Sequence, residues 1–273
     1  MSADAHALIQ KYGLRAKKSW GQNFLVDERA YREIVHACAV GDGDWIIEIG
    51  AGLGTLTRRL ADTGAHVVAV ERERDMLEVL RTELGGDARI EVTEANALTY
   101  DYAALAARAG KPPVVVGNLP YQIASPILFR LMETRAQLSR IVVMLQKEMA
   151  DRIVAPPGEK AYGALSVMVR LWGEPKLVCR VRAGGFVPAP RVDSAVLRIV
   201  PHATPLEVER EKFSRVVHAA FGQRRKTLRN ALFAAFDEGA VDRALAAADI
   251  DGKRRGETLS VDEFARLTRA IDA

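Results

Sequence analysis

The sequence has few cysteines, and its histidines are not grouped. Cys38 and Cys179 are the two cysteines among 273 residues, and they stand far apart with no partner motif. This excludes a disulfide framework and fits a protein of the reducing cytoplasm. The five histidines are scattered without the spacing of metal ligands, so we expect no structural or catalytic zinc site.

Long apolar runs are also missing. No stretch of 18 consecutive apolar residues occurs, so we expect no membrane-spanning segment. The first ten residues carry Asp4 and His6 and lack the basic-then-apolar pattern of a secretion signal. Hydrophobic residues still make up 49% of the chain and charged residues 27%. This composition excludes disorder as the main state, and the length allows a catalytic core with a small second domain.

The excess of positive charge is small and local. Lys and Arg number 39 against 35 acidic residues, a net charge of +4, which alone does not identify a nucleic-acid-binding protein. Two dense clusters stand out: Arg224, Arg225, Lys226 and Arg229, and Lys11, Arg15, Lys17 and Lys18. An isolated run of this kind is usually a solvated helix face, whereas in an RNA-modifying protein it binds phosphates.

The hydrophobic pattern predicts alternating strands and helices over the first 200 residues. Short apolar runs occur at residues 45–49, 66–70, 89–92, 114–116 and 141–145. Because these runs are almost continuously apolar, they predict a parallel sheet covered on both faces. Residues 176–182 and 195–200 are further strand candidates, expected to close the sheet as a hairpin-like pair. Asp27 is the expected N-cap of the first helix, with Ile34, Val35 and Cys38 on one face.

After Pro201 the chain becomes rich in alanine and helical in pattern. Helices are predicted at residues 206–221, 226–236, 241–248 and 261–271, the last opened by a capping box of Ser260 and Glu263. We therefore expect an α/β domain over residues 1–201 and a helical domain over residues 206–273.

A glycine-rich turn follows the first predicted strand. Residues 46–55 read Ile-Ile-Glu-Ile-Gly-Ala-Gly-Leu-Gly-Thr, and glycine lets the backbone approach a ligand closely because it has no Cβ. The spacing G-x-G-x-G of Gly50, Gly52 and Gly54 differs from the dinucleotide pattern G-x-G-x-x-G, which disfavours NAD. The next strand ends in Glu71, whose carboxylate can accept both hydroxyls of a ribose. Together these features predict a nucleoside site; the alternative is a plain tight turn with a surface glutamate.

The strand at residues 114–116 leads into Gly-Asn-Leu-Pro-Tyr. Methyl transfer to an exocyclic amino group is difficult because the nitrogen lone pair is delocalised into the ring, and acceptors aimed at its N–H bonds oppose that delocalisation. The Asn118 side chain and a backbone carbonyl of Leu119 or Pro120 supply two such acceptors. Pro120 stiffens the turn, and Tyr121 offers a ring for a flipped base. The alternative is an ordinary Asn-x-Pro turn with a core tyrosine.

Seven blocks, in order, are similar to those of the ribosomal RNA adenine dimethyltransferase family, and they span nearly the whole chain. They are residues 21–25, 48–52, 118–121, 145–148, 160–163, 186–195 and 224–227. The resemblance implies a class I methyltransferase fold, Rossmann-like with a mostly parallel sheet, and a small all-helical C-terminal domain. It also implies S-adenosylmethionine as methyl donor, without a metal, in a cytoplasmic monomer.

The substrate implied by this resemblance is small-subunit rRNA. It comprises two adjacent adenines in the 3′-terminal hairpin loop of 16S rRNA, within the 30S subunit or its precursor. A second reading is a resistance-type enzyme of large-subunit rRNA, and a third is an assembly factor that checks immature small subunits. The blocks at residues 160–163 and 224–227 favour the small-subunit enzyme.

The resemblance also assigns roles to residues. For the donor, Asn23 and Leu25 would contact it, Gly50 would line its methionine end, and Glu71 would hold its ribose. Gly52 is a further expected donor-binding residue.

For the acceptor, the resemblance places Asn118 between donor and target amine, and it places Tyr121 and Phe186 on either side of the base. Asn23, Leu25 and Phe186 would otherwise have been interpreted as a polar loop residue and two core residues. Lys17, Lys18, Arg224, Arg225 and Lys226 are the expected RNA-binding residues.

One position departs from the family pattern. Asn96 stands where the family usually has an Asp, which would accept from the amino group of the donor's adenine. Asn96 can accept as a neutral partner, and charge-assisted bonds are roughly twice as strong. We therefore expect a modestly weaker adenine contact, unless Glu94 supplies the acceptor through a register two residues away.

Overall fold

The computed structural model describes residues 5–14, 22–204, 206–223 and 225–271. Of the predicted RNA-binding residues, Lys17, Lys18 and Arg224 therefore lie outside the described part. Contacts divide the chain into two compact units. The first runs to Ala150 and includes Lys176–Pro201, and the second combines Asp151–Pro175 with the residues from His202 onward. The grouping thus places residues 151–175, which the sequence interpretation assigned to 1–201, with the C-terminal helices.

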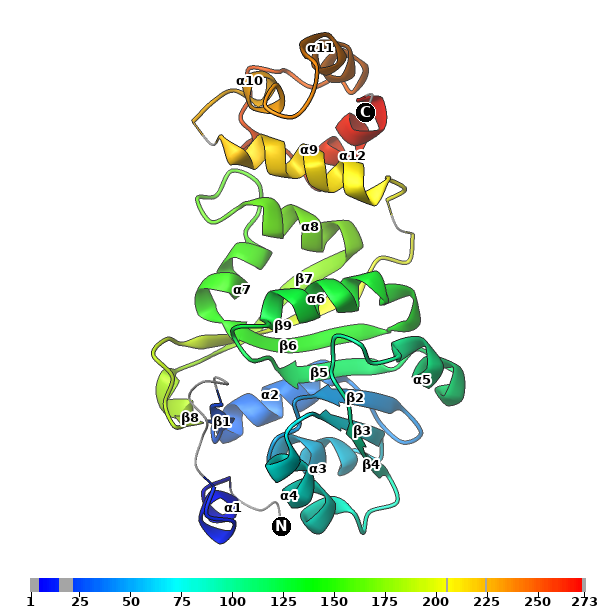
Figure 1. Cartoon of the computed structure of the whole chain (residues 1–273), viewed down its shortest axis with the longest axis vertical. Coiled ribbons are helices and arrows are strands. Elements are labelled where there is room, and N and C mark those ends of the chain that lie inside the picture. The colour runs from blue at the N-terminus through cyan, green and yellow to red at the C-terminus, as the bar shows by residue number, and fades with distance from the viewer. Residues whose placement is uncertain (1–4, 15–21, 205, 224, 272–273) are drawn as a thin grey trace. The chain divides into compact units, whose positions relative to one another are not determined.

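The first unit is built on a seven-stranded sheet (Figure 1). Its strand order is β4 (Ile90–Glu94), β3 (His66–Glu71), β2 (Trp45–Ile49), β5 (Val114–Asn118), β6 (Arg140–Gln146), β9 (Ser194–Pro201) and β7 (Gly173–Val181). The pairs from β4 to β6 are parallel, and β9 runs antiparallel to β6. This confirms the predicted, mostly parallel sheet and the closing neighbours β9 and β7.

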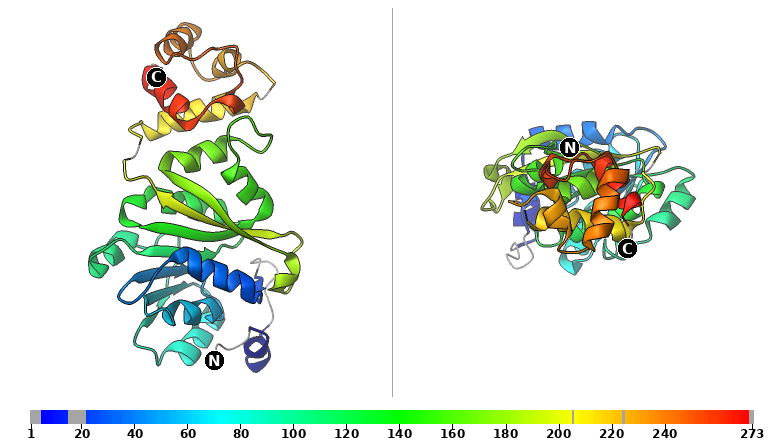
Figure 2. Two further views of the ribbon diagram at one scale, coloured as in Figure 1. Left: turned by 180° about the vertical axis from the view of Figure 1, so that it is seen from behind. Right: turned by 90° about the horizontal axis from the view of Figure 1, so that it is seen from above.

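Both faces of the sheet are covered, as the apolar strands predicted. In β2 and β6 successive residues are buried, which requires cover on both sides. The helices of the sheet region are α2 (Glu28–Cys38), α3 (Thr55–Ala61), α4 (Arg74–Leu84), α5 (Tyr102–Ala109) and α6 (Ala124–Glu133). Helix α7 (Lys147–Val154) begins in the first unit and ends in the second. Helix α6 is in front in Figure 1 and α2 is in front in the left view of Figure 2, so these two helices cover opposite faces.

Helix α2 begins as predicted. The Asp27 carboxylate accepts a hydrogen bond of 3.0 Å from the Ala30 N–H, which satisfies one of the unpaired amides of the first turn. Ile34 and Cys38 are buried in the main apolar cluster against strands β2, β5 and β6, and Val35 packs beside them. The cysteine predicted to be a core residue is thus fully covered, with 0% exposure.

Two elements were not predicted. Helix α1 (Ala5–Lys11) packs through Ala5 and Leu8 into a small cluster with Leu53 and Met76. A short antiparallel pair joins β1 (Phe24–Leu25) to β8 (Phe186–Val187). The helix is shorter than two full turns, and each strand has two residues, so neither leaves a readable periodicity.

The second unit is helical. It contains α8 (Ala164–Trp172), α9 (Arg210–Gly222), α10 (Leu228–Leu232), α11 (Glu238–Ala247) and α12 (Val261–Ala270). The predicted capping box is confirmed: the Glu263 N–H donates to the Ser260 hydroxyl, and the Ser260 N–H donates to the Glu263 carboxylate. Across the described residues no helix is long and apolar enough to cross a membrane.

Candidate active site

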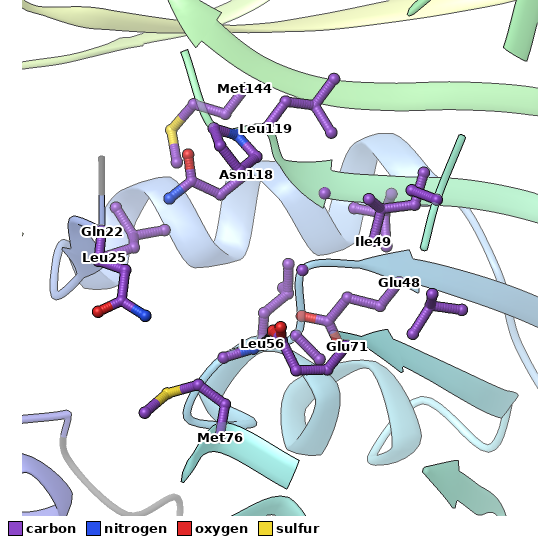
Figure 3. A pocket seen from close by; sticks show the side chains of 18 of the residues that line it. Gln22, Leu25, Glu48, Ile49, Leu56, Glu71, Met76, Asn118, Leu119 and Met144 are labelled. Atoms are coloured by element: carbon purple, nitrogen blue, oxygen red, sulfur yellow. Dashed lines mark hydrogen bonds between the residues drawn. The ribbon is translucent and has the colours of Figure 1, made fainter. Parts of the chain in front are cut away.

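A cavity of about 410 Å³ opens at the carboxyl ends of the parallel strands. That volume lies within the usual range for a small-molecule site, and this edge is where ligands bind open parallel sheets. Its walls come from the loop after β2, the tip of β3, the residues after β4 and the turn after β5. Figure 3 shows Asn118 and Met144 on one side of the cavity and Glu71 and Met76 on the other.

The glycine loop owes its shape to positive φ angles. Gly50, Gly52 and Gly54 have φ values of 69°, 53° and 75°, a region that strongly favours glycine. A Cβ on Gly54 would also lie 2.6 Å from a methyl carbon of Leu84, so this glycine lets the loop close onto α4. At Gly50 and Gly52 an added Cβ meets no atom closer than 3.6 Å. At these two positions glycine is therefore required by the positive φ angle and not by lack of space. Both residues line the cavity.

The Glu71 carboxylate is fixed by three backbone amides. One oxygen accepts from the Gly52 N–H at 3.0 Å, and the other accepts from Arg72 at 2.7 Å and Glu73 at 2.9 Å. Glu71 therefore clamps the glycine loop as well as facing the cavity. A carboxylate has about four acceptor positions, so these three bonds leave about one position, on the oxygen that Gly52 contacts, for a ribose hydroxyl.

Glu48 is a second buried acid in the cavity wall. It is 2% exposed and accepts a hydrogen bond of 2.5 Å from the Thr57 hydroxyl. Burial raises the pKa of Glu48 to about 8, and the nearby Glu71 charge acts in the same direction. This side chain therefore resists ionisation at neutral pH.

We expect Glu48→Gln to flatten the pH dependence of stability. The folded-state pKa of about 8 lies above the ordinary value of 4.5, so the folded protein binds the extra proton and loses stability as pH rises from about 4.5 to 8. Glutamine keeps the shape and removes the ionisation, so the variant should gain a few kcal/mol relative to wild type by pH 8. Thermal unfolding between pH 4.5 and 8.5 measures this, with the exposed Glu91→Gln as control. Parallel curves for wild type and Glu48→Gln would contradict the assignment.

Asn96 follows β4 and lines the cavity. Its side-chain oxygen accepts from the Leu98 N–H at 3.0 Å, which orients the amide. The alternative acceptor, Glu94, is wrong: its side chain is 53% exposed, faces Arg81 at 3.9 Å and is not among the described lining residues.

Asn118 stands at the tip of β5, where its amide is held in one orientation. Its Nδ2 donates to the Asn23 carbonyl oxygen at 3.1 Å. The Asn23 carbonyl oxygen can only accept a hydrogen bond, so the atom of the Asn118 amide that faces it must be the nitrogen. The Oδ1 atom is consequently turned away from Asn23, and it is available as a hydrogen-bond acceptor.

The backbone of the next two residues is held by one bond to strand β6 and by one bond within the turn itself. The Leu119 N–H donates to the Met144 carbonyl at 3.2 Å, and the Pro120 carbonyl accepts from Ile123 at 3.0 Å. The Leu119 carbonyl is therefore the better second acceptor for a target amine. Tyr121 lines the cavity, and its hydroxyl is 2.8 Å from the Ser194 hydroxyl.

Residues 22–25 close one side of the cavity. Gln22 donates to the Glu73 carboxylate at 2.7 Å, and the Leu25 carbonyl accepts from the Tyr31 hydroxyl at 2.6 Å. Asn23 and Leu25, which only the family resemblance singled out, both line the cavity. Gln22 also lines the cavity and was missed as a site residue, although it belongs to the same sequence block.

Phe186 does not join the cavity wall described here. It is 3% exposed, pairs with Leu25 across β1 and β8, and packs into the main apolar cluster. A role beside the base would require this side chain to leave that cluster. Met76 was missed as well: it lies in the first turns of α4 and contributes to the wall. The feature of the sequence that could have identified Met76 is its position five residues after Glu71, at the start of the following helix.

The C-terminal basic cluster divides into two kinds of residue. Arg225 and Lys226 are exposed. Arg229 instead forms a bidentate ion pair with Asp242, with distances of 2.5 and 2.7 Å, and lies over the Phe233 ring. Arg229 therefore joins two helices of its unit. No group of His, Cys, Asp and Glu suited to a metal ion occurs among the described residues.

Comparison with known proteins gives a consistent result. A family model described as "Ribosomal RNA adenine dimethylase" matches residues 13–273. A ribosomal RNA small subunit methyltransferase A from Anaeromyxobacter sp. (strain K) is 49% identical, over 97% of this chain and 96% of its own length. The protein of the same name from Myxococcus xanthus is 46% identical, over 97% and 94%.

Solved structures agree in fold. A dimethyladenosine transferase from Plasmodium falciparum superposes with a TM-score of 0.78 at 24% identity, covering 89% of this chain and 95% of that chain. The 23S rRNA methyltransferase ErmE gives a TM-score of 0.72 at 27% identity, covering 92% and 100%. The sheet and its helices thus have the class I methyltransferase architecture that the sequence predicted.

Proposed function

This chain belongs to the ribosomal RNA adenine dimethylase family, and from that premise we propose that it dimethylates two adjacent adenines in the 3′-terminal hairpin loop of 16S rRNA. The chain is an rRNA adenine dimethyltransferase that uses S-adenosylmethionine. We further propose that it acts as a cytoplasmic monomer on the 30S subunit or its precursor. The small-subunit relatives at 46–49% identity favour this substrate over 23S rRNA.

The cavity fits the donor. S-adenosylmethionine supplies a methyl group on a sulfonium centre, and its nucleoside carries ribose hydroxyls and an adenine amine that need acceptors. Glu71 would accept from the ribose, and Asn96 would accept from the adenine. Gly50 and Gly52 allow close approach of the methionine end because they carry no Cβ, and residues Asn23 and Leu25 would cover it.

The observation that carries the mechanism is the orientation of Asn118. Its Oδ1 accepts one N–H of the target amine, and the Leu119 carbonyl accepts the other. These two acceptors oppose delocalisation of the nitrogen lone pair into the purine, so the nitrogen becomes a better nucleophile. The chain's contribution is placement and fixed dipoles, and the displaced proton passes to water.

The test of the proposed function is direct methylation. Unmethylated 30S and 50S subunits would be incubated separately with the protein and labelled donor, and the modified nucleotides mapped. We expect dimethylation at two adjacent adenines of the 16S 3′ hairpin. Modification of 50S subunits alone would contradict the proposed substrate.

We expect Asn96→Asp to tighten donor binding. The charged acceptor would replace a neutral one toward the donor's adenine, and charge-assisted hydrogen bonds are about twice as strong. The expected gain in affinity is about 3- to 10-fold. Calorimetric titration of the donor measures it. Unchanged or weaker binding would show that Asn96 does not make this contact.

We expect Arg225→Ala with Lys226→Ala to weaken binding to the 30S subunit. Each lost phosphate contact lowers the slope of log affinity against log salt by about 1. The matched control is Arg108→Ala with Lys111→Ala, which removes the same charge from the pairs with Glu91 and Asp44. Binding to the 30S subunit would be measured at several salt concentrations. An unaltered slope would mean that Arg225 and Lys226 lie on a solvated surface and do not contact phosphates.

A further inference from the structure

Ser194 is a buried polar residue that neither the donor site nor the target acceptors use. It is 0% exposed at the start of β9 and is followed by the fully buried Ala195, Val196 and Leu197. A buried hydroxyl is costly unless it has a partner. Its partner is the hydroxyl of Tyr121, at 2.8 Å.

Ser194 is held on a rigid part of the sheet. It lies opposite Gln146 in the antiparallel pair of β6 and β9. Its neighbour Asp193 is fixed at two points: its carbonyl accepts from the Lys147 N–H at 2.9 Å, and its carboxylate accepts from the Ala183 N–H at 3.0 Å. The Ser194 hydroxyl is therefore a fixed point beside the cavity.

Tyr121, in contrast, comes from the turn between β5 and α6, and its ring lines the cavity. The backbone of this turn is fixed through Leu119 and Pro120, but a tyrosine ring can still rotate about two side-chain bonds. The hydroxyl oxygen lies on the axis of the second bond, so a hydrogen bond to it fixes the direction in which the ring extends, which is set by rotation about the first bond. A phenolic hydroxyl also lies in the plane of its ring because the oxygen is conjugated with it, so the direction of the bond to Ser194 favours one plane of the ring.

We infer that Ser194 is a positioning residue for the methyl transfer: through the Tyr121 hydroxyl it holds the ring in the plane against which the target adenine stacks. The inference rests on the proposed function. It explains why a hydroxyl precedes the buried apolar run Ala195–Leu197, at a position where alanine would satisfy packing alone. Ser194 touches neither donor nor the reacting atoms, so its effect should pass entirely through Tyr121.

A double-mutant cycle tests this. Ser194→Ala removes the anchor, and Tyr121→Phe keeps the ring but removes the hydroxyl. Each variant and the double variant would be assayed on 30S subunits for kcat, together with the donor Kd by calorimetry. We expect each single variant to lower kcat about 10-fold, and the double variant to lose about 10-fold as well instead of the multiplied 100-fold, because both remove one shared interaction. The donor Kd should stay within about twofold of wild type.

The matched control is Tyr162→Phe. Tyr162 is also buried and its hydroxyl donates to the Leu259 carbonyl at 2.7 Å, and it is not among the described residues that line the cavity. Its kcat should stay close to wild type, and thermal unfolding checks the fold of every variant. Multiplicative losses in the double variant, or Ser194→Ala activity equal to wild type, would overturn the inference. An inactive wild-type protein would instead contradict the proposed function, so the two failures are distinguishable.

Discussion

Asn118→Ala should lower the methyl-transfer rate by about 10²- to 10³-fold, the usual cost of removing a fixed polar group from a transition state. The donor Kd should stay within about twofold. The reason is the proposed role of Asn118, whose Oδ1 would accept from the target amine, while the Nδ2 contact to Asn23 orients the amide. Single-turnover rates on 30S subunits and calorimetry of the donor measure the two quantities separately.

Asn118→Asp sharpens this prediction. Aspartate keeps an oxygen acceptor of the same shape but places a second oxygen against the Asn23 carbonyl, where the nitrogen now donates at 3.1 Å. The side chain should rotate away, and the rate should fall although an acceptor is still present. Comparable losses of rate and donor affinity in Asn118→Ala would instead assign Asn118 to donor binding.

Glu71→Ala should weaken donor binding by about 10-fold or more, the equivalent of one charge-assisted hydrogen bond at about 1.5 kcal/mol. The truncation removes the proposed ribose acceptor. It also leaves the amides of Gly52, Arg72 and Glu73 without their common partner. The rate at saturating donor should recover most of the wild-type value, since Glu71 does not face the target amine.

The adjacent strand supplies a control for Glu71. Glu94 is the register partner of Glu71 at the tip of β4, but its side chain is half-exposed and lies outside the described cavity wall. Glu94→Ala removes the same charge from the same edge of the sheet, so donor affinity should stay near wild type. Equal losses of donor affinity in the two variants would mean that Glu71 acts only through its negative charge and not through hydrogen bonds to the ribose.

Much of the donor site could be predicted because it depends on strand order. Gly50, Glu71, Asn96 and Asn118 each follow a parallel strand, and the carboxyl ends of neighbouring parallel strands meet at one edge. The strand pattern in the sequence is therefore enough to predict that these residues lie together. The short pair β1–β8 and helix α1 could not be predicted, because their pairing and packing depend on tertiary contacts.

The roles of polar side chains were less predictable than their positions. The sequence marked Arg229 as one of four clustered cations, but its pairing with Asp242 depends on how α10 and α11 pack. The sequence marked Ser194 only as part of a block. The role inferred for its hydroxyl depends on the contact with Tyr121, 73 positions away. Phe186 shows the opposite case, in which a residue expected at the site lies in the apolar cluster.

The assignment of residues 151–175 to the second unit has a practical consequence for making shortened proteins. Helix α8 buries Val167, Leu171 and Trp172 and contacts α9 and α12, yet it precedes β7 and β9 of the sheet along the chain. A protein cut at residue 201 would keep α8 without the helices that cover it. Such a fragment would expose the apolar face of α8 to solvent and tend to aggregate. The C-terminal helices therefore cannot be removed by a single truncation.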